Sequence, residues 1–248
     1  MGILTKLEQL GDRARRLAAG STLRGENYYC PICNKHSSRF LDFGIPPRRE
    51  VQCPHCGSLE RHRLLWLFLE QRTDIFTRCG GNMLHIAPEQ CLREHFTNQF
   101  DGNYITADFM APDVDVKMDI QNIDFPDESF DIIYCSHVLE HVDDDRKAMR
   151  EFCRVLKADG WAILLVPITA QSTYEDKSIT SPEERLKHFG QIDHVRRYGP
   201  DYIDRLREAG FTVTETRPSD LADAAFAGKA RLADGSSIFM CRKVPVTA

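Results

Sequence analysis

The chain has 248 residues, of which 42% are hydrophobic and 28% are charged, and its formal net charge is −5. This is the composition of a globular protein, and it excludes a disordered or fibrous chain and a uniformly basic nucleic-acid-binding protein. Because no apolar run is long enough to span a bilayer and charged residues interrupt residues 1–20, the sequence predicts no membrane span and no signal peptide, and we expect a cytoplasmic protein.

The first predicted element is an amphipathic helix over residues 1–23, in which leucines recur at helical spacing. A small zinc-ribbon module is predicted next, over residues 24–60. It contains two C-x-x-C pairs, and an odd total of nine cysteines argues against a disulfide framework. Two such pairs about 20 residues apart match the spacing of a closed, structural zinc site. The predicted zinc ligands are Cys30, Cys33, Cys53 and Cys56.

Between the two cysteine pairs, apolar residues around Gly44-Ile45-Pro46-Pro47 predict a short β-hairpin. Residues 1–75 carry 12 basic and 8 acidic residues, a net charge of +4, whereas the rest of the chain carries a net charge of −9. A basic ribbon is compatible with an RNA or protein partner, and equally with an ordinary solvated surface. A linking helix is predicted over residues 61–79, with Ser58 as its N-cap.

From residue 80 to residue 248, short apolar runs alternate with helical stretches, a pattern that predicts a doubly wound parallel sheet. Pro88 favours the first turn of a helix directly after the first strand. Helices are also expected over 143–157 and 201–209, the latter followed by Gly210. The expected strands are 82–87, 104–108, 114–119, 130–135, 161–167, 211–215 and 237–241.

Two of these strands end in an acidic residue. Ligands of such sheets bind outside the carboxyl ends of the strands, so Asp108 and Asp119 are expected to gather near the loop after the first strand. Asp108 lies 21 residues beyond Ala87, close to the spacing at which a carboxylate binds ribose hydroxyls. Because Asp119 is placed to accept from an exocyclic amine of a base, the pattern predicts an adenosine-containing ligand.

The segment from Asp119 through Phe125-Pro126-Asp127-Glu128-Ser129-Phe130-Asp131 to Val138-Leu139-Glu140-His141-Val142 resembles the class I S-adenosylmethionine-dependent methyltransferases, type 11 in particular. The resemblance covers about residues 80–248 and implies a Rossmann-like, seven-stranded α/β sheet. It further implies that Asp108 binds the ribose of S-adenosylmethionine, that Asp119 and Ile120 contact the adenine, and that Ser136 and His137 contact the methionine end.

The first loop departs from the family, whose loop is usually rich in glycine. Here it is His85-Ile86-Ala87-Pro88-Glu89-Gln90. S-adenosylmethionine has no pyrophosphate, so close backbone approach is less stringent than in a dinucleotide site. We expect His85, Ala87 and Glu89 to contact the cofactor, with Glu89 or His85 replacing backbone contacts to its amino group.

His137-x-x-Glu140-His141 has the spelling of an inverted zinc-peptidase motif, but its position after a strand of a methyltransferase-like sheet disfavours a peptidase. On a helix these residues would share one face. Some small-RNA and quinone O-methyltransferases hold a divalent ion with a comparable helix and a later histidine, which implies a second ion at His137, Glu140 and His141. The later ligand would then be His188 or His194, and the alternative is a packing role.

Residues 168–199 are expected to form an insert that selects the substrate, with His188, His194 and Tyr198 as its polar candidates. The predicted activity is S-adenosylmethionine-dependent methyl transfer to O or N of a small-molecule or glycan-like acceptor, with His141 and His194 as candidate bases. Two alternatives stay open: an RNA methyltransferase that grips nucleic acid with the ribbon, and a non-catalytic binding module.

Overall fold

The computed structural model describes residues 11, 15–16, 18–44, 46–233 and 235–245. It divides the chain into two compact units, and each consists of segments that are distant in sequence. The first unit comprises residues 1–77, 90–98 and 216–237, and the second comprises residues 78–89, 99–215 and 238–248. Most of the helix predicted over residues 1–23 lies outside the described residues, although residues 18–22 are helical.

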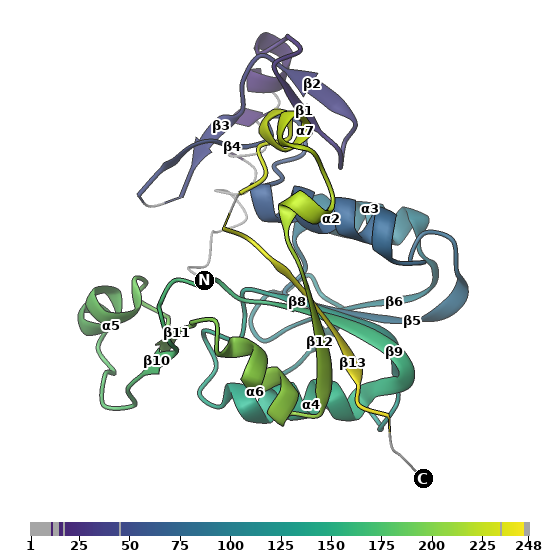
Figure 1. Ribbon diagram of the computed structural model, residues 1–248, viewed down its shortest axis with the longest axis vertical. Helices are drawn as coiled ribbons and strands as arrows, with labels where there is room; N and C mark the ends of the chain where they lie inside the picture. Colours follow the sequence, from purple (N-terminus) through teal and green to yellow (C-terminus); the bar gives the residue numbers. More distant parts are fainter. Residues whose placement is uncertain (1–10, 12–14, 17, 45, 234, 246–248) are drawn as a thin grey trace. The chain divides into compact units, whose positions relative to one another are not determined.

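The first unit begins with two short antiparallel hairpins (Figure 1). β1 (Tyr28–Cys30) pairs with β2 (Lys35–Ser37), and β3 (Leu41–Phe43) pairs with β4 (Arg48–Gln52). The second hairpin is the one predicted between the cysteine pairs. Because strands of three to five residues bury little surface, such hairpins need additional support.

α2 (Glu60–Arg72) follows the ribbon and is buried along most of its length. Its Trp66 ring packs against Phe76 and against His95 of α3 (Gln90–Gln99), with ring centroids 4.9 Å apart in each pair. The first unit also contains η1 (Pro218–Asp220) and α7 (Ala224–Lys229).

The predicted N-cap of α2 is wrong. The helix begins at Glu60 with Leu59 as its N-cap residue, and the Leu59 N–H donates to His62 Nδ1 at 3.1 Å. Ser58 instead turns its hydroxyl toward Cys30 and Cys56, with each Oγ–Sγ distance 3.2 Å.

The second unit is built on a seven-stranded sheet in the order β12-β13-β9-β8-β5-β6-β7 (Figure 1). The chain enters at the centre, runs outward to one edge, and returns to the centre to build the other half. β5 is parallel to both β6 and β8, and β13 is antiparallel to β9. The strands are β5 (Cys79–Ile86), β6 (Asp101–Asp108), β7 (Val116–Lys117), β8 (Phe130–Ser136), β9 (Leu156–Leu165), β12 (Phe211–Thr216) and β13 (Ile238–Lys243).

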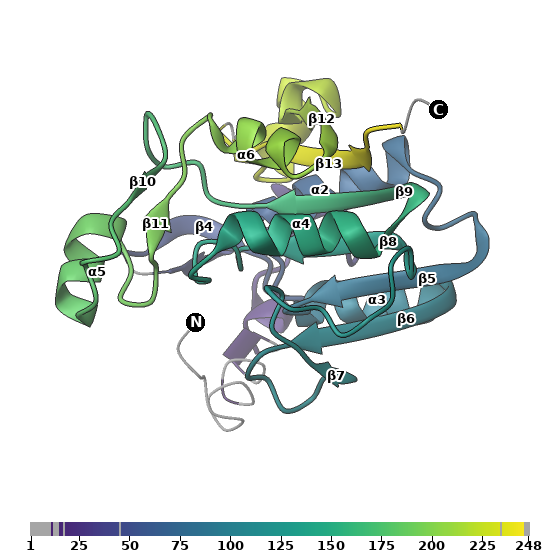
Figure 2. The same ribbon diagram turned by 90° about the horizontal axis from the view of Figure 1, so that it is seen from below.

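β8 is buried at all seven of its positions, as expected for a central strand covered on both faces. α4 (Asp145–Val155) runs along β8 and β9 (Figure 2), and its N-cap Asp144 accepts a hydrogen bond from the Lys147 N–H at 2.9 Å. α6 (Tyr202–Glu208) is followed by Gly210, whose φ of 102° is the left-handed value predicted for the residue after a helix.

The insert after β9 has more secondary structure than the sequence indicates. It contains α5 (Pro182–Phe189) and a small two-stranded antiparallel sheet of β10 (Tyr174–Glu175) and β11 (Arg196–Arg197). Figure 2 shows it beyond the ends toward which the arrows of β5 and β6 point. In the described part of the chain, no helix is both long and apolar enough to cross a membrane.

Candidate active site and cysteine cluster

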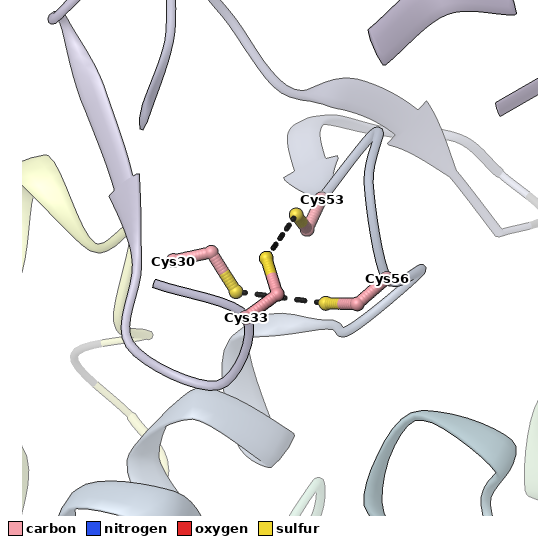
Figure 3. A group of neighbouring side chains, drawn as sticks. All are labelled: Cys30, Cys33, Cys53 and Cys56. Carbon is pink, nitrogen blue, oxygen red and sulfur yellow. Dashed lines mark hydrogen bonds between the residues drawn. The ribbon is translucent and has the colours of Figure 1, made fainter. Parts of the chain in front are cut away.

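The four predicted zinc ligands lie together in the first unit (Figure 3). All four Sγ atoms are within 4.8 Å of one another, with Cys30 to Cys56 at 3.6 Å and Cys33 to Cys53 at 3.8 Å. A disulfide would bring two sulfur atoms to about 2.05 Å, so these are four separate thiols. Four ligands in a tetrahedron with Zn–S bonds of about 2.3 Å lie about 3.8 Å apart, so the cluster fits a tetrahedral metal ion.

Arg63 of α2 connects the ribbon to the C-terminal part of the first unit. Its fully buried guanidinium donates to the carbonyl oxygens of Ser58, Val51, Ala230 and Arg231 over 2.6–3.1 Å. It also lies over the Phe40 ring at 4.7 Å. Arg63 is thus a structural residue and is not available to an external anion.

In the second unit, the predicted cofactor residues lie where parallel strands end. Strands are added toward one edge of the sheet after β5 and toward the other edge from β8 onward, so the boundary between β5 and β8 is the switch point at which doubly wound sheets bind ligands. After β5, Ala87 takes a φ of 49°, a left-handed conformation in which glycine is more usual. Its N–H donates to the Ala107 carbonyl at 2.8 Å, so the first loop turns tightly without a glycine.

Glu89 is fixed by two side chains beneath this loop. Its Oε2 lies 3.0 Å from Nε2 of the fully buried His85, and its Oε1 accepts from the Tyr134 hydroxyl at 3.1 Å. His85 Nδ1 is 2.7 Å from the Tyr104 hydroxyl. The carboxylate can only accept, so Nε2 of His85 carries a proton that it donates to Glu89.

The two strand-terminal acids stabilise their own loops. Asp108 Oδ1 accepts from the N–H groups of Met110 and Ala111 at 2.6 and 2.7 Å. Asp119 Oδ1 accepts from the Gln121 N–H at 2.9 Å, and the neighbouring Ile120 is buried. Both side chains are half-buried, so each still presents part of its carboxylate to a ligand.

Ser136 ends β8 with a buried hydroxyl, and the described part of the chain contains no hydrogen-bond partner for its Oγ. The next residue, His137, has a φ of 56°. The His137-x-x-Glu140-His141 motif therefore does not lie on a helix, because this left-handed residue ends the strand in a turn and α4 begins only at Asp145.

The turn nevertheless brings the predicted ionisable residues together. One ligand atom from each of Glu140, His141 and His194 lies within 4.8 Å of the others. Burial alone would raise the pKa of Glu140, but the hydrogen bond from His137 and the charges of His137 and His141 lower it below its ordinary value. Burial lowers the pKa of His194, which favours the neutral imidazole.

The other two polar candidates of the insert lie elsewhere. His188 Nδ1 is 3.4 Å from the Tyr174 hydroxyl and its Nε2 is 3.3 Å from Glu184. Tyr198 is fully buried, and its hydroxyl donates to Asp145 Oδ2 at 2.7 Å. Burial raises the pKa of Tyr198 well above its ordinary value, so this phenol is a structural donor and not a proton carrier.

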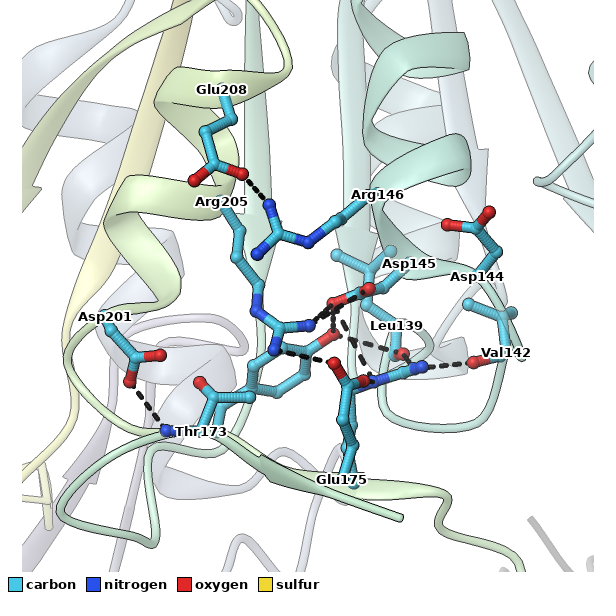
Figure 4. Close-up of polar contacts among 12 residues, drawn as sticks. Leu139, Val142, Asp144, Asp145, Arg146, Thr173, Glu175, Asp201, Arg205 and Glu208 are labelled. Atoms are coloured by element: carbon cyan, nitrogen blue, oxygen red, sulfur yellow. Dashed lines mark hydrogen bonds and ion pairs between the residues drawn. The ribbon is translucent and has the colours of Figure 1, made fainter. Parts of the chain in front are cut away.

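Sequence reasoning missed the ion-pair network that holds the insert (Figure 4). Arg205 of α6 binds Asp145 of α4 at 2.9 Å and Glu175 of β10 at 2.9 Å. Arg196 donates to Glu175 at 3.0 Å and to the carbonyl oxygens of Leu139, Val142 and Asp143 over 2.5–3.0 Å. Buried arginines of this kind look like surface charges in a sequence, so only the fold reveals the network.

Part of this chain is similar to known methyltransferases. Residues 79–164 match a family model described as "Methyltransferase domain". Over 76 residues the chain is 51% identical to the uncharacterized methyltransferase YcgJ of Bacillus subtilis. The matched stretch covers 31% of this chain and 28% of YcgJ. The chain thus spans little more than a quarter of the length of this curated relative.

Solved structures with low sequence identity share the fold. An S-adenosylmethionine-dependent methyltransferase from Mesorhizobium loti is 15% identical with a TM-score of 0.51, covering 73% of this chain and 98% of that one. The 1,6-didemethyltoxoflavin-N1-methyltransferase of Burkholderia thailandensis is 14% identical with a TM-score of 0.50, covering 75% and 78%. Residues 79–164 of this chain are therefore similar to a methyltransferase domain, and the solved structures share its fold.

Proposed function

We propose that this protein transfers a methyl group from S-adenosylmethionine to O or N of a small-molecule or glycan-like acceptor. The observation that carries the proposal is the buried, unpartnered Ser136 hydroxyl at the switch point of a methyltransferase domain. A buried polar atom without a partner costs about 1–3 kcal/mol, which a bound ligand with a polar end would relieve.

The proposed cofactor residues divide by the part of the molecule that each would bind. Asp108 would accept from the ribose hydroxyls, and Asp119 with Ile120 would contact the adenine. Glu89, fixed by His85, is suited to the positively charged amino group of the methionine end, because charge-assisted hydrogen bonds are the stronger kind. The full proposed set is His85, Ala87, Glu89, Asp108, Asp119, Ile120, Ser136 and His137.

When bound, the cofactor supplies a methyl group on a positively charged sulfur. In the proposed transfer, the acceptor atom would form a bond to the methyl carbon while the carbon–sulfur bond breaks. The electron pair of the broken bond would stay on the sulfur of S-adenosylhomocysteine. Where the acceptor is a hydroxyl, its proton has to leave. We propose that His141 or His194 accepts this proton as a general base.

We further propose that the four-cysteine cluster binds a structural zinc ion. Four thiolates close the coordination sphere and leave no position for a substrate. The ion would stabilise two hairpins that are too short to be stable alone, and the chemistry of methyl transfer belongs to the other unit.

A small acceptor is favoured over RNA by the distribution of charge. Residues 76–248 carry a net charge of −9, which repels a polyanion, and Arg63, a basic residue of α2 directly after the ribbon, is buried. Arg39 and Arg49 are exposed, so the RNA alternative has a defined test. The affinity of the protein for RNA would fall steeply with salt, and the double substitution Arg39→Ala and Arg49→Ala would weaken RNA binding.

Calorimetry with S-adenosylmethionine, followed by an acceptor screen that measures S-adenosylhomocysteine, tests the proposal. We expect saturable binding and turnover with hydroxylated or amino-bearing small molecules. Absence of heat at saturating cofactor would support a non-catalytic module instead. Among active variants, full turnover by both His141→Ala and His194→Ala would exclude these histidines from proton removal.

A further inference from the structure

Glu140 has an unsatisfied, buried carboxylate oxygen. Its side chain is 1% exposed, and Oε1 lies 3.3 Å from Nδ1 of His137. Oε2 has no hydrogen-bond partner in the described part of the chain. An ionised oxygen that is removed from water without compensation is strongly destabilising, so this position calls for a positively charged or hydrogen-bonding partner.

Two imidazole rings lie beside the Glu140 carboxylate. The rings of His141 and His194 meet edge to face with centroids 4.7 Å apart, and His194 is 6% exposed. One ligand atom of each histidine and one of Glu140 lie within 4.8 Å of one another. Bonds of about 2.0–2.2 Å to a common ion place two ligand atoms about 3–4 Å apart, so a small inward movement of the side chains would complete the site.

The surrounding contacts hold one histidine in a defined tautomer. His141 Nδ1 lies 3.3 Å from the carbonyl oxygen of Asp193 and 3.4 Å from its Oδ2. Both oxygens accept, so Nδ1 carries a proton, and Nε2 is the nitrogen left to bind a metal ion. A second contact of this kind, from ring N–H to carbonyl or carboxylate, is typical of metal-binding histidines.

The backbone fixes the spacing between the two halves of the cluster. The Val195 N–H donates to the Glu140 carbonyl at 2.9 Å, which ties the residue after His194 to the turn that carries Glu140. Arg196 then donates to carbonyl oxygens of the same turn. The three side chains are therefore preorganised by the fold, although 53 positions separate His141 from His194 in the sequence.

We propose that Glu140, His141 and His194 bind one divalent first-row transition-metal ion. Two imidazoles and one carboxylate suit Zn²⁺, Fe²⁺, Co²⁺ or Mn²⁺, whereas Mg²⁺ and Ca²⁺ prefer sites made of oxygen ligands alone. Three protein ligands leave positions open, in contrast to the closed four-cysteine cluster.

The role of this ion rests on the proposed function. An acceptor hydroxyl held at an open position would lose its proton to solvent more readily, because the positive charge lowers its pKa. His141 and His194 would then act as ligands and not as free bases. Metal binding itself requires neither cofactor nor acceptor, so it is measured independently of turnover.

Titration of the full-length, zinc-loaded protein with Co²⁺ tests the site. We expect one additional Co²⁺ per chain by elemental analysis, with a visible spectrum that lacks the charge-transfer band of a cobalt–thiolate site. This spectrum distinguishes the new site from exchange into the cysteine cluster. Glu140→Gln and His194→Ala are each expected to weaken Co²⁺ binding at least about tenfold.

His188→Ala is the matched control, because this histidine lies in the same insert outside the cluster and its removal is expected to leave Co²⁺ affinity unchanged. Circular dichroism establishes that each variant is folded, and the partly exposed His141→Ala provides a third ligand variant if Glu140→Gln does not fold. The proposal is overturned if the zinc-loaded protein takes up no Co²⁺, or if folded ligand variants bind it as tightly as the wild type. Loss of S-adenosylmethionine binding or turnover with Co²⁺ uptake intact would count against the proposed function alone.

Discussion

At the scale of single residues, Glu89 shows how a loop without glycines can still present a ligand-binding group. Both carboxylate oxygens of Glu89 are engaged, by His85 and by Tyr134, and Tyr104 holds His85 in turn. This chain of contacts fixes the side chain before any ligand arrives, which reduces the entropy lost on binding.

Glu89→Gln is expected to weaken S-adenosylmethionine binding by about tenfold or more, because a hydrogen bond to a charged group contributes about 1.5–3 kcal/mol. Isothermal titration calorimetry measures the change. Glu94→Gln, on the exposed face of α3, serves as the control with unchanged affinity. Equal affinity of Glu89→Gln and the wild type would remove Glu89 from the cofactor site.

Asp131 is a second residue whose charge matters, in this case for stability. Burial would raise its pKa, but hydrogen bonds from Lys157 Nζ at 2.8 Å and from the Asn82 N–H at 2.7 Å outweigh burial and lower the pKa below its ordinary value. The stabilisation is therefore present above the pKa of the unfolded state, about 3.9, and is lost as the pH falls through the lower pKa of the folded state.

Asp131→Asn is expected to lower the free energy of unfolding by about 1–3 kcal/mol at neutral pH, and by progressively less as the pH falls below about 4. Urea unfolding at a series of pH values measures the difference. Asp127→Asn, which removes an exposed partner of Arg154, should cost less than about 1 kcal/mol. A pH-independent difference for Asp131→Asn would contradict the assignment to its charge.

At the scale of elements, the ribbon depends on its cysteines more than on its strands. β1, β2 and β3 have three residues each, and isolated hairpins of this size are marginal in water. The proposed zinc ion would connect the turn after β1 with the turn after β4. Binding energies of structural zinc sites are about 10–16 kcal/mol, enough to decide whether such a module folds.

Removal of zinc with a chelator is therefore expected to open the two hairpins and to expose residues 24–60 to proteases. Limited proteolysis followed by mass spectrometry locates the cleavage sites. Cys33→Ser should give the same pattern without chelator, whereas Cys79→Ser, a change at an exposed cysteine outside the cluster, should not. A ribbon that resists proteases after verified zinc removal would mean that protein contacts alone hold it.

Local patterns predict some elements of this fold well and others poorly. The buried strands β5, β8 and β9 are evident as apolar runs, and the cysteine pairs predict their own cluster. The conformation of His137 was not predictable, because a left-handed φ at a residue other than glycine follows from tertiary packing and leaves no local pattern in the sequence. That His194, and not His188, lies beside Glu140 and His141 likewise depends on the pairing of β10 with β11, whose strands have only two residues each.

At the scale of the whole molecule, the first unit is assembled from three segments of the chain. Residues 90–98 and 216–237 belong with the ribbon and α2, although they lie within the stretch that the sequence assigns to the methyltransferase domain. The division by contacts thus differs from the predicted ranges, because consecutive residues of a strand–helix–strand unit are shared between two cores.

A chain truncated to residues 80–248 is therefore expected to be insoluble or to unfold at a markedly lower temperature than the full-length protein. It would leave Leu92 and Phe96 of α3, both fully buried, without the α2 residues of their unit. Differential scanning calorimetry and size-exclusion chromatography measure the effect. A truncated chain that stays monomeric with an unchanged melting temperature would show that the second unit is independent.

The contacts of Arg63 also bear on the order of events during synthesis. Two of its four carbonyl partners belong to Ala230 and Arg231, near the end of the chain. N-terminal domains commonly fold while the ribosome is still translating the rest. Here the guanidinium stays incompletely paired until almost the whole chain has emerged, so the module that is translated first is among the last to be finished.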